Sequence, residues 1–129
     1  MADKEKPVIM VVEDNEDNRD LIIKVLGRQG YEMVGVDDGN EALAKLDLVL
    51  PDLILMDINL PGMDGYEVTR RIRSSEMHRS IPIVALTAHA MQGDEAKSLA
   101  AGCDAYVAKP INVRTFPLTV ARILEQKKR

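Results

Sequence analysis

Five polar residues whose side chains could act together stand directly after short apolar runs. They comprise three carboxylates, a hydroxyl and an amine: Glu13, Asp14, Asp57, Thr87 and Lys109. Carboxylates brought close together cannot all stay ionised unless one of them takes up a proton or a cation lies among them. Mg²⁺ suits such a site, because it prefers oxygen ligands, keeps several waters and also binds substrate phosphate.

The hydroxyl and the amine indicate what this site would bind. Lys109 can neutralise an incoming anion, and the hydroxyl of Thr87 can donate a hydrogen bond to one of its oxygens. A cation, a lysine and a hydroxyl around one carboxylate are suited to phosphoryl transfer onto that carboxylate. The alternative is a salt-bridge network that joins the strand ends, but a buried network of net negative charge is costly.

Strands must bring these residues together, because they are far apart in the sequence. The predicted strands are Val8–Val12, Tyr31–Val36, Leu53–Met56, Ile81–Leu86 and Ala105–Ala108. Leu53–Met56 shows no alternation of polar and apolar residues, which is typical of a strand covered on both faces. Asp57 follows it at once. In a parallel sheet the carboxyl ends of all strands lie at one edge, the edge where open α/β sheets bind ligands.

Each segment between the predicted strands, and the segment after the last one, has apolar residues at helical spacing. The expected helical positions are Leu21, Ile22, Val25 and Leu26; Ala42, Leu43, Leu46, Val49 and Leu50; Val68 and Ile72 within Tyr66–Ser74; the segment Met91–Ala101; and Phe116, Val120, Ile123 and Leu124. Gly30 and Gly102 are expected to end helices, and Asp38-Gly39 marks a turn. Five strands alternating with five helices predict right-handed crossovers and a doubly wound α/β fold with helices on both faces.

Composition restricts the class of protein. The chain has 129 residues, 46% of them hydrophobic and 29% charged, which fits one globular domain and argues against disorder. No apolar run reaches the roughly 20 residues of a membrane helix, and the charged start lacks a signal peptide, so a cytoplasmic location is expected. A net charge of -4 argues against nucleic-acid binding. Cys103 is the only cysteine and is interpreted as a small buried apolar residue.

Four motifs occur in an order that resembles the receiver domain of two-component response regulators. They are Val11-Val12-Glu13-Asp14-Asn15, Asp52 to Gly65 with Asp57 at the centre, Ala85-Leu86-Thr87-Ala88, and Lys109-Pro110. The resemblance runs from about Val8 to Leu124. It implies a five-stranded flavodoxin-like sheet of order 2-1-3-4-5. It further implies that residues 1–129 are a single stand-alone receiver domain with a core of about 8–124 and no output domain.

The resemblance assigns roles residue by residue. Asp57 would be the phosphoacceptor, and Thr87 and Lys109 would contact the phosphoryl group. Tyr106 resembles the switch aromatic that turns inward when Thr87 moves. Magnesium would be bound by the residues Glu13 (through water), Asp14, Asp57 and Asn59 (through its backbone carbonyl). The bond between Lys109 and Pro110 resembles the family's cis peptide.

Two residues depart from the family's pattern. Glu13 stands where the family more often has Asp, which keeps the charge but changes how the water of the metal is held. Pro117 would interrupt a last helix that began near Asn112. We therefore expect this helix to begin later, with Thr115 near its cap, or to have an irregular first turn.

The resemblance implies a signalling switch rather than an enzyme, catalysing only phosphoryl transfer onto its own Asp57 and slow self-dephosphorylation. The donor would be a histidine kinase or a histidine phosphotransfer protein, and the output would be binding to a downstream protein by a monomer or weak dimer. An alternative is an aspartate-nucleophile phosphatase of the haloacid dehalogenase type, but Asn59 stands where such an enzyme needs a second acid. A flavin-binding electron carrier would need a phosphate loop where Glu13 and Asp14 stand.

Overall fold

The computed structural model describes residues 6–88 and 93–127, and within them five parallel strands form one sheet. The strands are β1 (Val8–Val12), β2 (Glu32–Val36), β3 (Leu53–Asp57), β4 (Ile83–Thr87) and β5 (Ala105–Ala108). Their order across the sheet is β2-β1-β3-β4-β5, which confirms the predicted flavodoxin-like order. All residues of β3 and β4 are buried, as their unbroken apolar runs predict.

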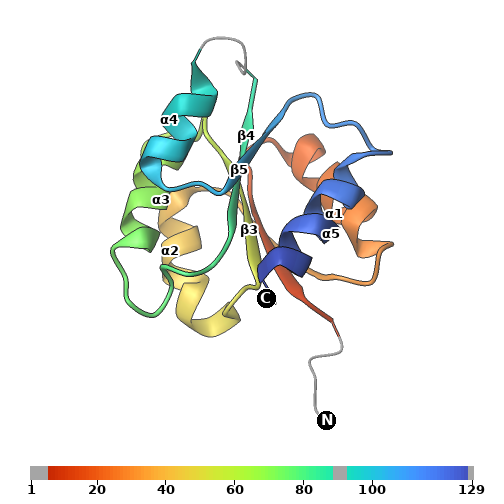
Figure 1. The fold of residues 1–129 in the computed structure, drawn as a ribbon, viewed down its shortest axis with the longest axis horizontal. Coiled ribbons are helices and arrows are strands. Elements are labelled where there is room, and N and C mark those ends of the chain that lie inside the picture. Colours follow the sequence, from red (N-terminus) through yellow and green to blue (C-terminus); the bar gives the residue numbers. More distant parts are fainter. Residues whose placement is uncertain (1–5, 89–92, 128–129) are drawn as a thin grey trace.

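Helices cover both faces of the sheet, with α1 and α5 on one side and α2, α3 and α4 on the other (Figure 1). Their bounds are α1 (Glu16–Gly27), α2 (Gly39–Val49), α3 (Gly65–Arg73), α4 (Asp94–Ala101) and α5 (Phe116–Lys127). Ile22, Leu26, Phe116 and Val120 belong to the core beneath α1 and α5. Ala42, Leu46, Val68 and Ile72 belong to the core on the opposite face. The sheet is therefore buried on both faces, as a doubly wound fold requires.

Three helices begin at a side chain that accepts a hydrogen bond from the backbone. Asn15, Asp38 and Asp64 are the N-caps of α1, α2 and α3, and each accepts from the N–H three residues later. Such caps satisfy N–H groups that have no partner within the helix. Asp38-Gly39, predicted as a turn, therefore starts a helix, and the three caps fix where the helices leave the carboxyl edge of the sheet.

The helix ends differ from the sequence prediction at several residues. Leu50 was expected at a helical position of the second helix, but α2 ends at Val49, and Leu50 is 53% exposed with a φ of 49°. Pro51 follows, and the residue before a proline is disfavoured in the helical conformation. Leu21 lies within α1, as its helical spacing predicts, but it is 41% exposed, because the buried stripe of α1 runs through Ile22 and Leu26.

The last two helices begin at Asp94 and Phe116. α5 begins at Phe116, and the carbonyl of Thr115 accepts from the N–H groups of Leu118 and Thr119. Pro117 thus lies in the first turn, where a missing N–H costs nothing, and the prediction for this residue is confirmed. α4 begins at Asp94, and Met91, where this helix was expected to begin, lies outside the described residues.

No helix over the described ranges is both long and apolar enough to span a lipid bilayer. Cys103 is buried, as predicted. The peptide bond between Lys109 and Pro110 is cis, as the resemblance implies.

Candidate functional site

The ends of four strands bring the predicted residues to one edge of the sheet. Asp57 and Thr87 are the last residues of β3 and β4, whereas Glu13 and Lys109 follow β1 and β5 directly. The register pairs Asp57 with Leu86, one residue before Thr87, so these strands end nearly level. The predicted grouping at the carboxyl edge is therefore found.

Two of the three carboxylates are deeply buried and share one cation. Glu13 and Asp57 are each 1% exposed, whereas Asp14 is exposed. Nζ of Lys109 lies 3.0 Å from Oδ1 of Asp57 and 3.3 Å from Oε1 of Glu13. One carboxylate oxygen from each of Glu13, Asp14 and Asp57 lies within 4.8 Å of the others. The edge therefore holds more negative than positive charge.

The crowding changes the ionisation of Glu13 and Lys109. Burial, followed by the hydrogen bond and charge of Asp57, raises the pKa of Glu13 to about 7. Burial alone would lower the pKa of Lys109, but the hydrogen bonds and charges of Asp57 and Glu13 together outweigh it, so the pKa of Lys109 is raised. Lys109 thus stays protonated at neutral pH, while Glu13 is close to its titration midpoint.

The oxygens at this edge match what a divalent cation requires. Oε1 of Glu13 is buried and has no partner in a well-formed hydrogen bond within the described residues, although it lies 3.3 Å from Nζ of Lys109. A buried acceptor left in this state is costly. A hard cation among Glu13, Asp14 and Asp57 would satisfy it with oxygen ligands of the kind that Mg²⁺ prefers. The residues present therefore fit a magnesium ion.

The loop after β3 is held close to Asp57. The backbone N–H of Asn59 donates to Oδ1 of Asp57 over 3.0 Å, and the N–H of Gly65 donates to the carbonyl of Ile58 over 3.0 Å. A Cβ atom at Gly65 would overlap the backbone carbonyl of Asp57. Glycine is therefore required there, since the start of α3 packs directly against the end of β3.

Thr87 and Tyr106 lie on one face of the sheet. Ala85 is in register with Tyr106 and Thr87 with Ala108, and alternate residues of a strand point to the same face. Thr87 is fully buried, whereas Tyr106 is half-buried and packs against the core beneath α2 and α3. Its hydroxyl donates to Oε1 of Glu95 on α4 over 3.4 Å.

The sequence prediction missed two residues that support Glu13. Nη1 of Arg19 donates to the carbonyl of Glu13 over 2.9 Å and pairs with Asp37 over 2.7 Å. The N–H of Asn15 donates to Oε2 of Glu13 over 3.2 Å. Arg19 is the one basic residue among the acidic residues in the first half of α1. This isolated positive charge is the only feature of the sequence that could have indicated its role.

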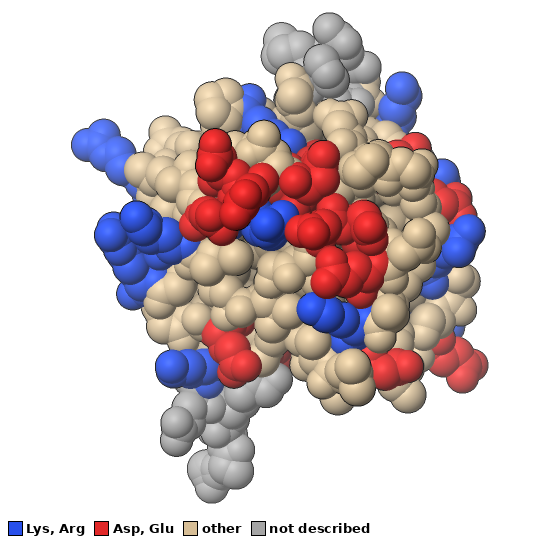
Figure 2. All heavy atoms as spheres, turned by 180° about the vertical axis from the view of Figure 1, so that it is seen from behind, with Lys and Arg blue, Asp and Glu red and all other residues tan. Residues whose placement is uncertain are grey.

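An open pocket of about 300 Å³ adjoins the site, between α1 and the segment after β5. It is lined by Glu13, Asn18, Leu21, Ala88, Lys109, Pro110 and Ile111. Asp14, Glu16 and Asp17, before and at the start of α1, are exposed, and Figure 2 shows acidic side chains gathered on the upper half of the face seen from behind. The site can thus be reached from the surface through a partly apolar opening.

Comparison with known proteins gives a consistent result. Residues 9–121 match the family model of the response regulator receiver domain. The polar-differentiation response regulator DivK of Brucella ovis is 45% identical over 116 residues, which cover 90% of this chain and 94% of DivK.

Two solved structures have the same fold over nearly their whole length. The chemotaxis response regulator CheY4 of Vibrio cholerae has a TM-score of 0.86 and 30% identity, covering 92% of this chain and 98% of CheY4. The receiver domain of the sensor histidine kinase PA1611 from Pseudomonas aeruginosa PAO1 has a TM-score of 0.82 and 41% identity, covering 94% and 96% of the two chains. That structure has a magnesium ion coordinated in its active-site cleft.

Proposed function

The chain belongs to the response regulator receiver domain family, whose members are phosphorylatable signalling switches, and on this premise we propose that Asp57 is its phosphoacceptor. The observation that carries the proposal is the environment of this residue. Asp57 ends the central strand, is 1% exposed and lies 3.0 Å from Nζ of Lys109. Family membership also favours the switch over the phosphatase alternative, for which Asn59 supplies no second acid.

Each residue of the site has a role in the proposed transfer. A carboxylate oxygen of Asp57 attacks the phosphorus of a phosphohistidine, the phosphorus–nitrogen bond breaks, and an acyl phosphate forms. Lys109 is protonated and close enough to Asp57 to pair with the transferred phosphoryl group. The Thr87 hydroxyl donates to a phosphoryl oxygen. Slow hydrolysis of the acyl phosphate returns the switch to its starting state.

We further propose that the acidic edge holds Mg²⁺. Asp14 and Asp57 would bind it directly, Glu13 through water, and Asn59 through its backbone carbonyl. When bound, the ion supplies positive charge that offsets the repulsion between the phosphoryl group and the carboxylates. The buried, unsatisfied Oε1 of Glu13 supports this assignment.

Phosphorylation would be transmitted through Thr87 and Tyr106. A charge-assisted hydrogen bond from Thr87 to the phosphoryl group is worth about 1.5–3 kcal/mol, enough to shift a two-state equilibrium by roughly tenfold to a hundredfold. The register places Tyr106 diagonally across from Thr87 on the same face, with alanines opposite both. The ring can therefore move towards Thr87, changing the surface formed by α4, β5 and α5.

The proposed partners are a phosphohistidine donor and a downstream protein. The donor is a histidine kinase or a histidine phosphotransfer protein. The pocket beside Leu21, Pro110 and Ile111 opens onto Lys109, so a donor helix seated there would bring its phosphohistidine to the acidic edge. The downstream protein would bind the surface of α4, β5 and α5 that changes on phosphorylation.

Phosphoryl transfer from acetyl phosphate tests this proposal. Wild-type protein incubated with acetyl phosphate and Mg²⁺ should gain the mass of one phosphoryl group, and the gain should disappear in excess EDTA. Asp57→Asn should gain nothing, while Asp52→Asn, a control carboxylate at the start of β3, should react normally. A full mass gain in Asp57→Asn would place the acceptor elsewhere.

A further inference from the structure

Glu95 has no role in the proposed phosphoryl transfer, yet its carboxylate accepts a hydrogen bond from the proposed switch residue, Tyr106. It lies in the first turn of α4 and is exposed. Its Oε1 accepts a hydrogen bond from the hydroxyl of Tyr106 over 3.4 Å. The bond joins β5 to the helix that packs beside it.

The position of this bond decides which state of Tyr106 it favours. Glu95 is at the surface, whereas Thr87 is fully buried. A ring that moves towards Thr87 carries its hydroxyl away from the surface and must give up the bond to Glu95. The bond can therefore form only when the Tyr106 ring points towards the surface, which we call the outward state. A contact made in one of two states shifts the equilibrium towards that state.

The helix that carries Glu95 is held firmly at its other end. Nε of Arg73 donates to the carbonyl of Gly102 over 2.8 Å, and the N–H of Cys103 donates to the carbonyl of Ser98 over 2.9 Å. At its start, the N-cap is Gly93, which has no side chain to form a capping bond. The hydrogen bond from Tyr106 thus ties the less well held end of α4 to the sheet.

We propose that Glu95 is a positioning residue that holds Tyr106 outward and biases the switch towards its unphosphorylated state. This inference rests on the proposed role of Tyr106. Its effect is modest, because one exposed hydrogen bond changes an equilibrium by about twofold to tenfold. Removing the bond should make activation easier without changing the chemistry at Asp57. By linkage, a ligand that favours the active state should then bind more tightly by the same factor.

Beryllofluoride, which mimics the phosphoryl group on a carboxylate, provides the probe. In its presence with Mg²⁺, the NMR signal of Thr87 is followed as the concentration rises. Glu95→Ala should lower the concentration at half-saturation by about twofold to tenfold. Glu95→Gln, which keeps an acceptor oxygen, should lower it less. Glu125→Ala removes an exposed carboxylate of α5 and is the matched control, for which no change is expected.

A second pair of variants separates this role from a general effect on α4. Tyr106→Phe keeps the ring and removes the hydroxyl, so Glu95→Ala should have no further effect in that background. In wild type, fluorotyrosine NMR should show the Tyr106 signal moving towards its beryllofluoride-bound position when Glu95 is replaced. An unchanged half-saturation in Glu95→Ala, with Tyr106 still responding to beryllofluoride, would overturn the role of Glu95 and leave the proposed switch intact. A wild-type Tyr106 that does not respond at all would overturn both.

Discussion

The amino edge and the carboxyl edge of the sheet each place a basic side chain among oxygens, but they differ in how fully those groups are satisfied. At the amino edge, Arg73 at the end of α3 donates to the carbonyl of Gly102 and to Oδ2 of Asp104, each over 2.8 Å. Its Nη1 donates to the carbonyls of Arg79 and Ile81 over 2.8 and 2.7 Å. This guanidinium therefore joins the ends of α3 and α4 to the starts of β4 and β5.

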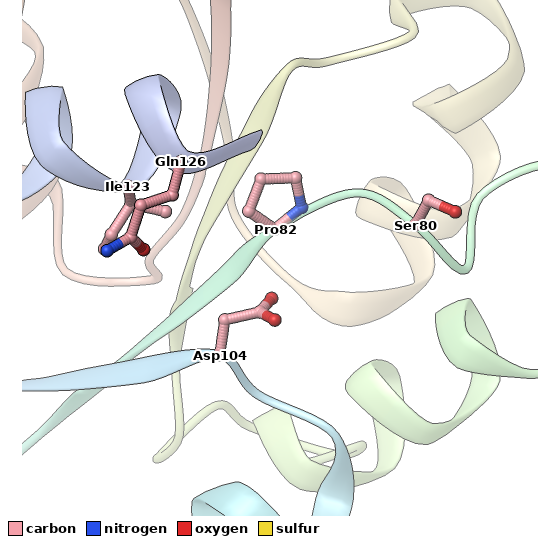
Figure 3. Close-up of a pocket in the computed structure, with 5 residues that line it drawn as sticks. All are labelled: Ser80, Pro82, Asp104, Ile123 and Gln126. Carbon is pink, nitrogen blue, oxygen red and sulfur yellow. The ribbon is translucent and has the colours of Figure 1, made fainter. Parts of the chain in front are cut away.

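The acid at the amino edge is satisfied in the same way. Oδ2 of Asp104 also accepts from the N–H of Ile83 over 2.8 Å. An open pocket of about 360 Å³ lies beside it, lined by Ser80, Pro82, Asp104, Ile123 and Gln126 (Figure 3). The acid of this pocket is thus paired with a cation and with the backbone, and one negative charge faces one positive charge.

The carboxyl edge is not balanced in this way. Two buried carboxylates, Glu13 and Asp57, share the single amine of Lys109, and Oε1 of Glu13 forms no hydrogen bond within the described ranges. The first arrangement balances its charges by itself, whereas the second keeps an excess of negative charge that the proposed magnesium ion would offset. A site that breaks the rules of stable packing in an otherwise regular fold is the expected position of function.

Replacing Arg73 should give the largest change in stability. Arg73→Ala removes a donor from three carbonyls and the paired cation from Asp104, and we expect the free energy of unfolding to fall by about 2–4 kcal/mol. Arg70→Ala, on the exposed side of the same helix, removes only a surface pair with Glu67 and should cost less than about 1 kcal/mol. Urea denaturation measures both. Equal losses would show that the amino edge is not a specific support.

The pH dependence of stability should reveal the strain at the carboxyl edge. The pKa of Glu13 is about 7 in the folded protein, above its ordinary value of 4.5. Its contribution to stability is therefore fully present below pH 4.5 and is lost as the pH rises through 7. In metal-free protein we expect a loss of about 2–3 kcal/mol across this range. Glu13→Gln, which cannot titrate, should have a flatter profile, and an unchanged profile would contradict the raised pKa.

Neutralising one acid at each edge should have opposite effects. Asp57→Asn leaves Glu13 and Lys109 as a balanced pair, so at pH 8 in EDTA the free energy of unfolding should rise by about 1–2 kcal/mol. Asp104→Asn weakens the bond to Arg73 and should lower the free energy of unfolding. Thermal and urea unfolding of the two variants provide the comparison. A loss of stability in Asp57→Asn would mean that its charge supports the fold.

Magnesium should produce the smallest change. At a concentration of Mg²⁺ about five times its Kd, binding to the folded state alone adds about 1 kcal/mol to stability. The increase should be present in wild type and much reduced in Asp57→Asn. An equal increase in both proteins would indicate that the ion binds outside the proposed site.

The carboxyl edge could be predicted from the sequence to a greater extent than the amino edge. Asp57 and Thr87 stand directly after unbroken apolar runs, and the parallel topology that those runs imply brings strand ends together. Arg73 gives no such signal. It lies in the last turn of an amphipathic helix, where a basic side chain is expected to be solvent-exposed. Three of its four hydrogen bonds go to backbone carbonyls. Because every residue has a backbone carbonyl, the residue types do not reveal which carbonyls Arg73 contacts.

A tertiary contact and a local backbone restriction explain two further differences. Glu95 lies in a different element from Tyr106, and the sequence alone contains nothing that pairs them. Leu50 carries the apolar pattern of α2 one residue too far, because local backbone restriction by Pro51 outweighs the pattern. Pro117, by contrast, could be placed from the sequence, because a proline is tolerated only in the first turn of a helix.

Chemical identification of the phosphorylated residue is the most direct test of the central claim, that Asp57 accepts the phosphoryl group. Borohydride reduces an aspartyl phosphate to homoserine, which leaves a stable mark on the modified residue. Wild-type protein is phosphorylated with acetyl phosphate and Mg²⁺, reduced and digested, and the peptide that contains β3 is sequenced by tandem mass spectrometry. We predict homoserine at position 57. Homoserine at position 14, or at any residue other than 57, would contradict the assignment.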